Sequence, residues 1–284
     1  TPGGPIEYGL AGDGPPVLAV HGAGGGFDQG LEIADPLVRI GFRVVAMSRF
    51  GYLQAPLPVD ASPAAQADAY ACLLDALDIQ RVAVVGASAG APSSMQFALR
   101  HPDRTAALVL LVPAAYPTQV EQRPGGAVPK RIPAALKLLF DAALKSDFLF
   151  WAASRIARTA MLQAILGTPA SVVRNASAEE RARIAGVLDH VQPLSRRRLG
   201  LLNDVSIVPS LPRYELERIA APTLILGMAD CLYGTYPGAR YSAEHIPRAR
   251  FISFSNGGHL WVGHQKEVMA EIAGFLRDAA GHAR

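Results

Sequence analysis

Short, uninterrupted apolar runs that alternate with helical patterns are the feature of this sequence that most constrains its fold. Six runs rich in β-branched residues lie at 16–22, 42–48, 81–86, 107–113, 222–227 and 250–255. They do not alternate between apolar and polar residues, so both faces of each strand are expected to be buried, as in a parallel sheet covered by helices. We therefore predict an α/β fold with a mostly parallel, doubly wound sheet.

Helical patterns lie between these strands and after the last one. Ser62 and Pro63 have the residue types of an N-cap and a first helical position, and the pattern that follows them predicts a helix as far as residue 76 or 77. Residues 91–100 and 265–279 predict two more helices. In a doubly wound sheet, ligands bind beyond the carboxyl ends of the strands.

Four polar residues are expected at that edge of the sheet. His21, Ser88 and Asp230 each come just after a predicted strand, and His259 follows the last strand closely. Their common position is the main structural argument for an active site there.

The long interval after residue 113 contains no convincing strand. Helical patterns at 133–145, 148–166, 178–191 and 193–205 predict a helical insertion, which is too long for a plain loop. We predict a core domain formed by residues 1–113 and 212–284, and a cap formed by residues 114–211 that lies over the carboxyl edge of the sheet. The apolar run at 148–154 is interpreted as the underside or core of this cap rather than as a membrane-touching stripe.

Composition excludes several classes of protein. The 284 residues carry a net charge of +3, which does not predict a nucleic-acid partner. Cys72 and Cys231 are the two cysteines and lack metal-ligand spacing, so we expect neither a disulfide scaffold nor a metal. Glycines and a proline interrupt the uncharged run at 82–99, which argues against a membrane span. A small-molecule substrate without a cofactor is expected, while the oligomeric state and the compartment, cytoplasmic or exported, stay open.

The stretch Gly86-Ala87-Ser88-Ala89-Gly90 matches the G-x-S-x-G nucleophile elbow. It follows a predicted buried strand and precedes a predicted helix, which is the context that this motif requires. A serine held on so sharp a turn projects its hydroxyl, and the flanking glycines avoid collisions with the neighbouring strand and helix. Ser88 is therefore the predicted nucleophile.

A serine nucleophile needs a base and a group that orients the base. His259, after the flexible stretch Asn256-Gly257-Gly258, is the predicted base, with His264 as its rival. Asp230 is the predicted acid, and Asp204 in the insertion is a weaker rival. The chain order of serine, acid and histidine is the one expected for this motif.

The stretch His21-Gly22-Ala23-Gly24-Gly25-Gly26 predicts an oxyanion hole, because glycine-rich turns expose backbone N–H groups. The expected donors are Ala23 or Gly24 together with Ala89, the residue after the nucleophile. His21 and Gly22 are expected to support this loop. Neither a P-loop nor a dinucleotide-binding spacing is present.

Taken together, these motifs resemble the α/β-hydrolase superfamily over nearly the whole chain. The pieces that carry the resemblance are "VHGAGGG", "SRFGY", "VVGASAG", "APTLILGMAD" and "GGH". The resemblance implies an eight-stranded, mostly parallel sheet, a helical cap between strands six and seven, and a triad of Ser88, Asp230 and His259.

Two positions depart from the usual pattern of that superfamily. Many relatives carry Asp where this chain has Ser48, and many have an acidic or polar residue where this chain has Cys231. The packing of the first loop is left open, and the thiol is interpreted as having no special role. Ser88 argues against the epoxide hydrolases and haloalkane dehalogenases, which use Asp as the nucleophile.

The leading functional prediction is a serine hydrolase of the carboxylesterase type that acts on small to medium acyl substrates. A carbon–carbon bond hydrolase of the meta-cleavage-product type is the first alternative, since a basic cap, with 14 Lys and Arg against 7 Asp and Glu between residues 121 and 213, suits an anionic dienoate. A cofactor-free perhydrolase is a further variant of the same chemistry. A catalytically silent receptor with this fold is the alternative from another class.

Overall fold

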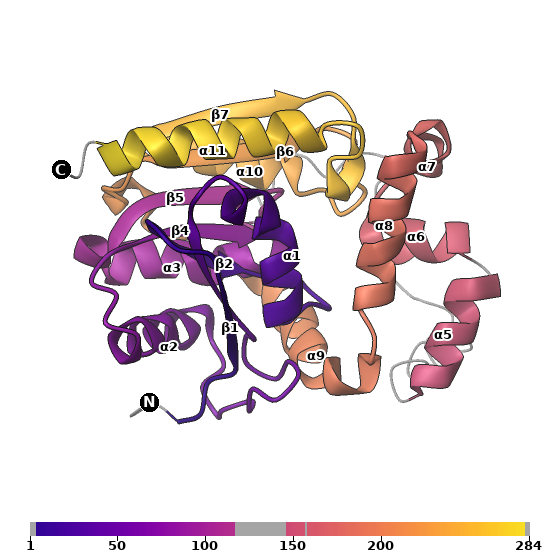
Figure 1. The fold of residues 1–284 in the computed structure, drawn as a ribbon, viewed down its shortest axis with the longest axis horizontal. Helices are drawn as coiled ribbons and strands as arrows, with labels where there is room; N and C mark the ends of the chain where they lie inside the picture. Colours follow the sequence, from indigo (N-terminus) through magenta and orange to yellow (C-terminus); the bar gives the residue numbers. More distant parts are fainter. Residues whose placement is uncertain (1–3, 117–145, 157, 282–284) are drawn as a thin grey trace.

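A seven-stranded sheet forms the centre of the molecule, in a computed structural model that describes residues 4–116, 146–156 and 158–281 (Figure 1). The strand order is β1-β3-β2-β4-β5-β6-β7. The strands are β1 (Tyr8–Ala11), β2 (Pro16–Val20), β3 (Arg43–Met47), β4 (Val82–Ala87), β5 (Thr105–Leu111), β6 (Thr223–Met228) and β7 (Ala249–Phe254). β1 is antiparallel to β3, and the other pairs are parallel.

The α/β class predicted from the apolar runs is thereby confirmed, and each predicted run overlaps a strand to within two residues at either end. The antiparallel strand β1 was not predicted, because its four residues are only half-buried and carry no continuous apolar run. The resemblance implied eight strands, whereas the described residues form seven.

Helices cover both faces of the sheet. The helices α1 (Phe27–Val38) and α11 (Gln265–Gly281) pack on one face. The helices α2 (Pro63–Ala76), α3 (Ala91–Arg100) and α10 (Tyr236–His245) pack on the other. Central strands are therefore buried on both sides, which is why their sequences are apolar throughout. At the start of α2, the Ser62 hydroxyl accepts the Ala65 N–H at 3.2 Å, as expected of an N-cap.

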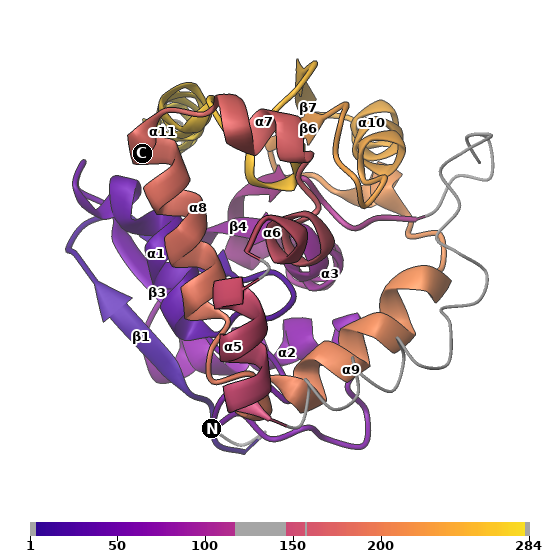
Figure 2. The same ribbon diagram turned by 90° about the vertical axis from the view of Figure 1, so that its right-hand side faces the viewer.

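The described residues between β5 and β6 form five α-helices. They are α5 (Asp147–Ile156), α6 (Arg158–Leu166), α7 (Ala170–Asn175), α8 (Ala178–His190) and α9 (Arg198–Ile207). Figures 1 and 2 show α5 to α8 grouped beside one end of the sheet. Helix α9 runs apart from this group, below α1 in the view of Figure 1. The group has its own apolar cluster, which includes Phe150, Ile184 and Leu188. The helix predicted at 133–145 lies outside the described residues.

Backbone hydrogen bonds connect this helical insertion to loops at the carboxyl edge of the sheet. The carbonyl oxygen of Gly167 accepts the N–H of Leu232, after β6, at 2.9 Å and the N–H of His259, after β7, at 3.3 Å. The insertion therefore contacts the loops that carry predicted site residues. Within the described part of the chain, no helix is long and apolar enough to cross a membrane.

Candidate active site

Ser88 lies on a strained turn between β4 and α3. Its φ of 50° falls in the left-handed region that residues with a side chain rarely adopt. A Cβ at Gly86 would lie 2.3 Å from Ser94 Oγ, and a Cβ at Gly90 would lie 2.5 Å from the carbonyl oxygen of His21. The spacing of the two glycines thus has a steric cause, because the turn packs against both α3 and the loop after β2.

His259 lies directly against this serine. It belongs to a short 3-10 turn after β7, Gly258–Leu260, and its Nε2 is 2.8 Å from Ser88 Oγ. Burial lowers the pKa of His259 to about 4. The imidazole is therefore neutral near pH 7, which is the form that can take a proton from a hydroxyl.

The other nitrogen of the same ring contacts a cysteine. The Cys231 sulfur is 3.2 Å from His259 Nδ1, and the Thr235 hydroxyl donates to that sulfur, also at 3.2 Å. Burial raises the pKa of Cys231, so the group is a neutral thiol. Sequence reasoning assigned no role to this residue; its place directly after Asp230 was the available signal.

Asp230 holds the loop that carries His259. Its carboxylate accepts the N–H of Gly257 at 3.2 Å and the N–H of Gly258 at 2.8 Å. Among the described residues, no hydrogen bond or ion pair joins Asp230 to the His259 ring. The structure thus brings Ser88 and His259 into direct contact, and places Asp230 against the backbone next to the histidine.

The two rival residues have other partners. His264 Nε2 is 2.9 Å from Asn256 Oδ1. Asp204 forms a buried ion pair with Arg49. Neither takes part in the contact between Ser88 and His259.

The glycine-rich loop after β2 lies beside Ser88. A Cβ at Gly22 would be 3.2 Å from Ser88 Cβ. His21 is fully buried, and its Nε2 accepts the Arg49 N–H at 2.9 Å, which leaves Nδ1 to donate to the Gly22 carbonyl oxygen at 2.7 Å. Burial, together with the nearby Arg49 charge, lowers the pKa of His21, so this ring is neutral.

The expected oxyanion donors differ in their availability. The Gly24 N–H donates to the Tyr52 hydroxyl at 3.3 Å. Ala23 is exposed, and its N–H has no acceptor among the described residues. Ala89 follows the nucleophile in the elbow. Of the two residues expected from this loop, Ala23 is therefore the one with a free donor.

A match to the family model for the alpha/beta hydrolase fold covers residues 15–262, which is most of the chain. The chain belongs to the α/β hydrolase family. The resemblance stated from the sequence motifs is thereby confirmed.

Known relatives of this hydrolase extend over its full length. It is 26% identical to an uncharacterised hydrolase of Bacillus subtilis over 96% of this chain and 95% of the relative. An α/β hydrolase fold protein from Nakamurella multipartita superposes with a TM-score of 0.74 at 27% identity, covering 99% of this chain and 98% of that one.

A shorter match links the hydrolase to an enzyme with a named substrate. It is 37% identical over 115 residues to the 2-hydroxy-6-oxononadienedioate/2-hydroxy-6-oxononatrienedioate hydrolase of Paraburkholderia xenovorans. That match covers 37% of this chain and 39% of the relative.

The loop after β3 explains one departure from the family pattern. Ser48, where many relatives have Asp, donates to Glu7 Oε2 at 2.6 Å and accepts the Phe27 N–H at 3.2 Å. The hydroxyl therefore connects the N-terminal segment to the start of α1.

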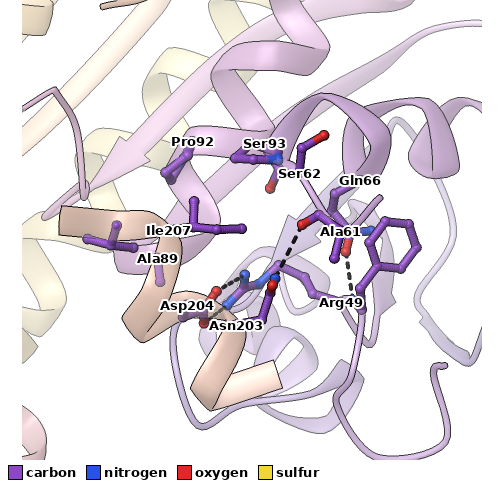
Figure 3. Close-up of a pocket in the computed structure, with 13 residues that line it drawn as sticks. Arg49, Ala61, Ser62, Gln66, Ala89, Pro92, Ser93, Asn203, Asp204 and Ile207 are labelled. Carbon is purple, nitrogen blue, oxygen red and sulfur yellow. Dashed lines mark hydrogen bonds and ion pairs between the residues drawn. The ribbon is translucent and has the colours of Figure 1, made fainter. Parts of the chain in front are cut away.

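A pocket lies next to the elbow of the hydrolase, between α2, α3 and α9 (Figure 3). Ala89 and Pro92 line one side of it, and Arg49 and Asp204 line another. Among the described residues, no cluster of three His, Cys, Asp or Glu side chains could hold a metal ion. The polar groups around the elbow suit proton transfer and attack by a hydroxyl.

Proposed function

We propose that this hydrolase cleaves carboxylic esters of small to medium acyl substrates through an acyl-enzyme on Ser88. The observation that carries the proposal is the 2.8 Å hydrogen bond between Ser88 Oγ and Nε2 of a neutral, buried His259. A hydroxyl needs such a base at hydrogen-bond distance in order to attack a carbonyl carbon.

In the proposed first half-reaction, Ser88 Oγ attacks the ester carbonyl while its proton passes to His259 Nε2. The carbonyl oxygen becomes an oxyanion, for which the Ala23 and Ala89 N–H groups are the proposed donors. The tetrahedral intermediate then breaks the bond to the alcohol, and His259 returns the proton to the leaving oxygen. The acyl group stays on Ser88.

Water completes the cycle by the same route. It attacks the acyl carbon, gives a proton to His259, and the intermediate releases the carboxylic acid as Ser88 recovers its proton. In this scheme Asp230 is the acid of the triad, but it acts on His259 indirectly. Its carboxylate fixes the backbone of Gly257 and Gly258, and thereby the position of His259. The helical insertion, residues 114–211 with the core on either side, is proposed as the cap that shapes the substrate pocket.

Hydrolysis of p-nitrophenyl acetate, butyrate and octanoate tests the proposal, with Ser88→Ala and a matched control, Ser253→Ala. Ser253 is an exposed serine on β7 whose hydroxyl forms a hydrogen bond with the Tyr236 hydroxyl. Ser88→Ala is expected to lower kcat by at least about 10³-fold, whereas the control should keep full activity. Mass spectrometry of quenched enzyme should show the acyl group on the peptide that contains Ser88. Full activity in Ser88→Ala would overturn the proposal.

A second candidate function is supported by the match to the Paraburkholderia xenovorans hydrolase, whose name specifies 2-hydroxy-6-oxononadienedioate and 2-hydroxy-6-oxononatrienedioate as substrates. The same serine and histidine would then serve carbon–carbon bond cleavage. A vinylogous diketone of that type, assayed beside the p-nitrophenyl esters, distinguishes the two. A kcat/KM for the diketone far above that for every ester would favour carbon–carbon cleavage.

A further inference from the structure

A buried ion pair connects the helical insertion to the core behind the glycine-rich loop after β2, residues 21–26. We call this loop the oxyanion loop, because the proposed function places an oxyanion donor in it. Arg49, two residues after β3, donates from Nη1 to Asp204 Oδ1 at 2.8 Å and from Nη2 to Oδ2 at 2.6 Å. The two side chains are 8% and 9% exposed and lie 155 positions apart in the chain (Figure 3). A buried ion pair is often no more stabilising than apolar residues in its place, so its presence calls for a further role.

The same guanidinium also fixes the carbonyl groups of the oxyanion loop. Arg49 Nε donates to the His21 carbonyl oxygen at 3.0 Å, and Nη2 donates to the Gly22 carbonyl oxygen at 3.2 Å. The Arg49 backbone N–H donates to His21 Nε2, so Nδ1 of that ring donates to the Gly22 oxygen, at 2.7 Å. The Gly25 N–H is a third, longer donor to this oxygen, at 3.4 Å. Arg49 therefore acts on the Gly22 oxygen both directly and through His21.

The geometry of the peptide bond transmits this constraint to Ala23. The Gly22 carbonyl and the Ala23 N–H belong to one planar trans peptide, in which the C=O and N–H bonds point in opposite directions. Holding the Gly22 oxygen toward Arg49 and His21 therefore directs the Ala23 N–H away from them. That N–H is the one without an acceptor among the described residues.

The peptide on the other side of Ala23 is linked to the same Asp204 carboxylate through Tyr52. The Tyr52 hydroxyl donates to Asp204 Oδ2 at 2.5 Å and accepts the Gly24 N–H at 3.3 Å. Asp204 thus binds both residues that fix the peptides next to Ala23: Arg49 for the Gly22–Ala23 peptide and Tyr52 for the Ala23–Gly24 peptide.

We propose that Asp204 of the insertion is a positioning residue for the oxyanion hole, acting through Arg49 and Tyr52 to set the direction of the Ala23 N–H. This inference rests on the proposed function. Helix α9, which carries Asp204, then contributes to the position of the oxyanion donor. Arg197, at the start of the same helix, adds a further contact, since its Nη1 donates to the Gly25 carbonyl oxygen at 2.6 Å.

Two single substitutions test the inference. Tyr52→Phe removes one hydroxyl, and Asp204→Asn removes the charge while keeping the shape of the side chain. A displaced oxyanion donor weakens transition-state binding more than substrate binding. We expect kcat to fall about 10-fold in Tyr52→Phe and about 100-fold in Asp204→Asn, with KM nearly unchanged.

The binding of an oxyanion mimic distinguishes the proposed role of Asp204 from a purely structural one, which would leave the Ki of the mimic unchanged. An aryl trifluoromethyl ketone adds to the serine and forms a tetrahedral oxyanion, so its Ki should rise by the same factor by which kcat/KM falls. The Kd of the product carboxylate, a ground-state ligand, should stay the same.

Asp204→Asn leaves Arg49 buried without its counter-ion and can therefore destabilise the protein. A double variant, Arg49→Met with Asp204→Leu, removes both charges and should recover the thermal stability of the wild type. It does not recover the two donors of the Arg49 side chain, to the Gly22 oxygen and to the His21 oxygen, although His21 Nδ1 still reaches the Gly22 oxygen. We therefore expect it to be folded, with kcat/KM still about 100-fold low.

The matched control is Asp68→Asn, which breaks an Arg–Asp pair of the same bidentate kind, with Arg100, on the surface. Its kcat and its Ki should stay within about 2-fold of the wild type, because an exposed pair contributes little. Wild-type kcat/KM and Ki in a folded double variant or in Tyr52→Phe would overturn the inference. Full activity in Ser88→Ala would instead overturn the proposed function, so the two failures are distinguishable.

Discussion

The sulfur of Cys231 lies 3.2 Å from Nδ1 of His259, on the side of the ring opposite Ser88. In a Ser-His-Asp triad this place belongs to the carboxylate that orients the imidazole. Here Thr235 donates a hydrogen bond to the same sulfur, and the sulfur can also accept from Nδ1 when the ring carries its proton on that nitrogen. Nε2 then keeps its lone pair for the proton of Ser88.

Exchanging this thiol for a carboxylate should change the basicity of His259. An adjacent negative charge favours the imidazolium, so Cys231→Asp is expected to raise the apparent pKa of the base by about 1 unit or more. The measurement is the pH profile of kcat/KM with p-nitrophenyl butyrate. Cys231→Ala should leave the ring without this partner and lower kcat by about 10-fold without an upward shift of the profile.

The second cysteine provides the control for those variants. Cys72 lies on α2 and is a free thiol, like Cys231. Cys72→Ala should reproduce the wild-type profile. If the pH profile of Cys231→Asp superposed on that of the wild type, a charge at position 231 would have no effect on the pKa of His259.

The wild-type enzyme should stay active at acidic pH. Burial lowers the pKa of His259 to about 4, and the base works only when neutral, which it is above that pKa. The kcat/KM is therefore expected to be level from neutral pH down to about 5, and to fall as the pH drops through about 4. Circular dichroism at each pH separates this limb from unfolding. A midpoint near the ordinary histidine value, with the fold intact, would contradict the low pKa.

Two substitutions at Asp230 distinguish a direct contact of its carboxylate with the His259 ring from an indirect effect through the backbone of the loop. Asp230→Asn keeps a carbonyl oxygen that can accept from Gly258, so a loop-positioning role predicts a loss in kcat of about 10-fold. Asp230→Ala removes both acceptors and should cost about 100-fold, because the backbone of His259 is no longer held.

A direct contact between the Asp230 carboxylate and the ring during catalysis predicts a different result. Asp230→Asn would then lower kcat by about 10⁴-fold, as expected when the acid of a triad is lost. Stopped-flow rates of acylation for both variants, at equal protein stability, distinguish the two roles.

Gly90 should not tolerate a side chain. A Cβ there would lie 2.5 Å from the carbonyl oxygen of His21 and 2.8 Å from that of Val20, and backbone atoms cannot give way easily. We expect Gly90→Ala to lower the free energy of unfolding by about 1–3 kcal/mol and to reduce kcat, since it separates the elbow from the oxyanion loop.

Gly274, in the middle of α11, provides the opposite control. A Cβ at this position meets no atom within 4 Å. Gly274→Ala should raise the free energy of unfolding by up to about 1 kcal/mol, because alanine favours a helix. Urea unfolding measures both variants, and equal effects in the two would contradict the steric account of the elbow.

Local sequence patterns determined much of the architecture. The continuous apolar runs marked six of the seven described strands, because strands buried on both faces leave no room for polar residues. Ser88 was recognisable because only glycine fits two positions before it and two positions after it, as the contacts of Gly86 and Gly90 show. Strand β1 and the helices α1, α7 and α10 were missed. Strand β1 has no continuous apolar run, and α1 contains Pro36.

Tertiary structure decided which groups meet at the site. Cys231 and Asp230 are neighbours in the chain, and only the path of the loop after β6 determines that the thiol contacts the His259 ring while the carboxylate binds the backbone. Asp204 and Arg49 are 155 positions apart, and their pairing depends on how α9 packs behind the oxyanion loop. Sequence patterns describe burial along one segment, whereas such contacts arise from the packing of distant segments in three dimensions.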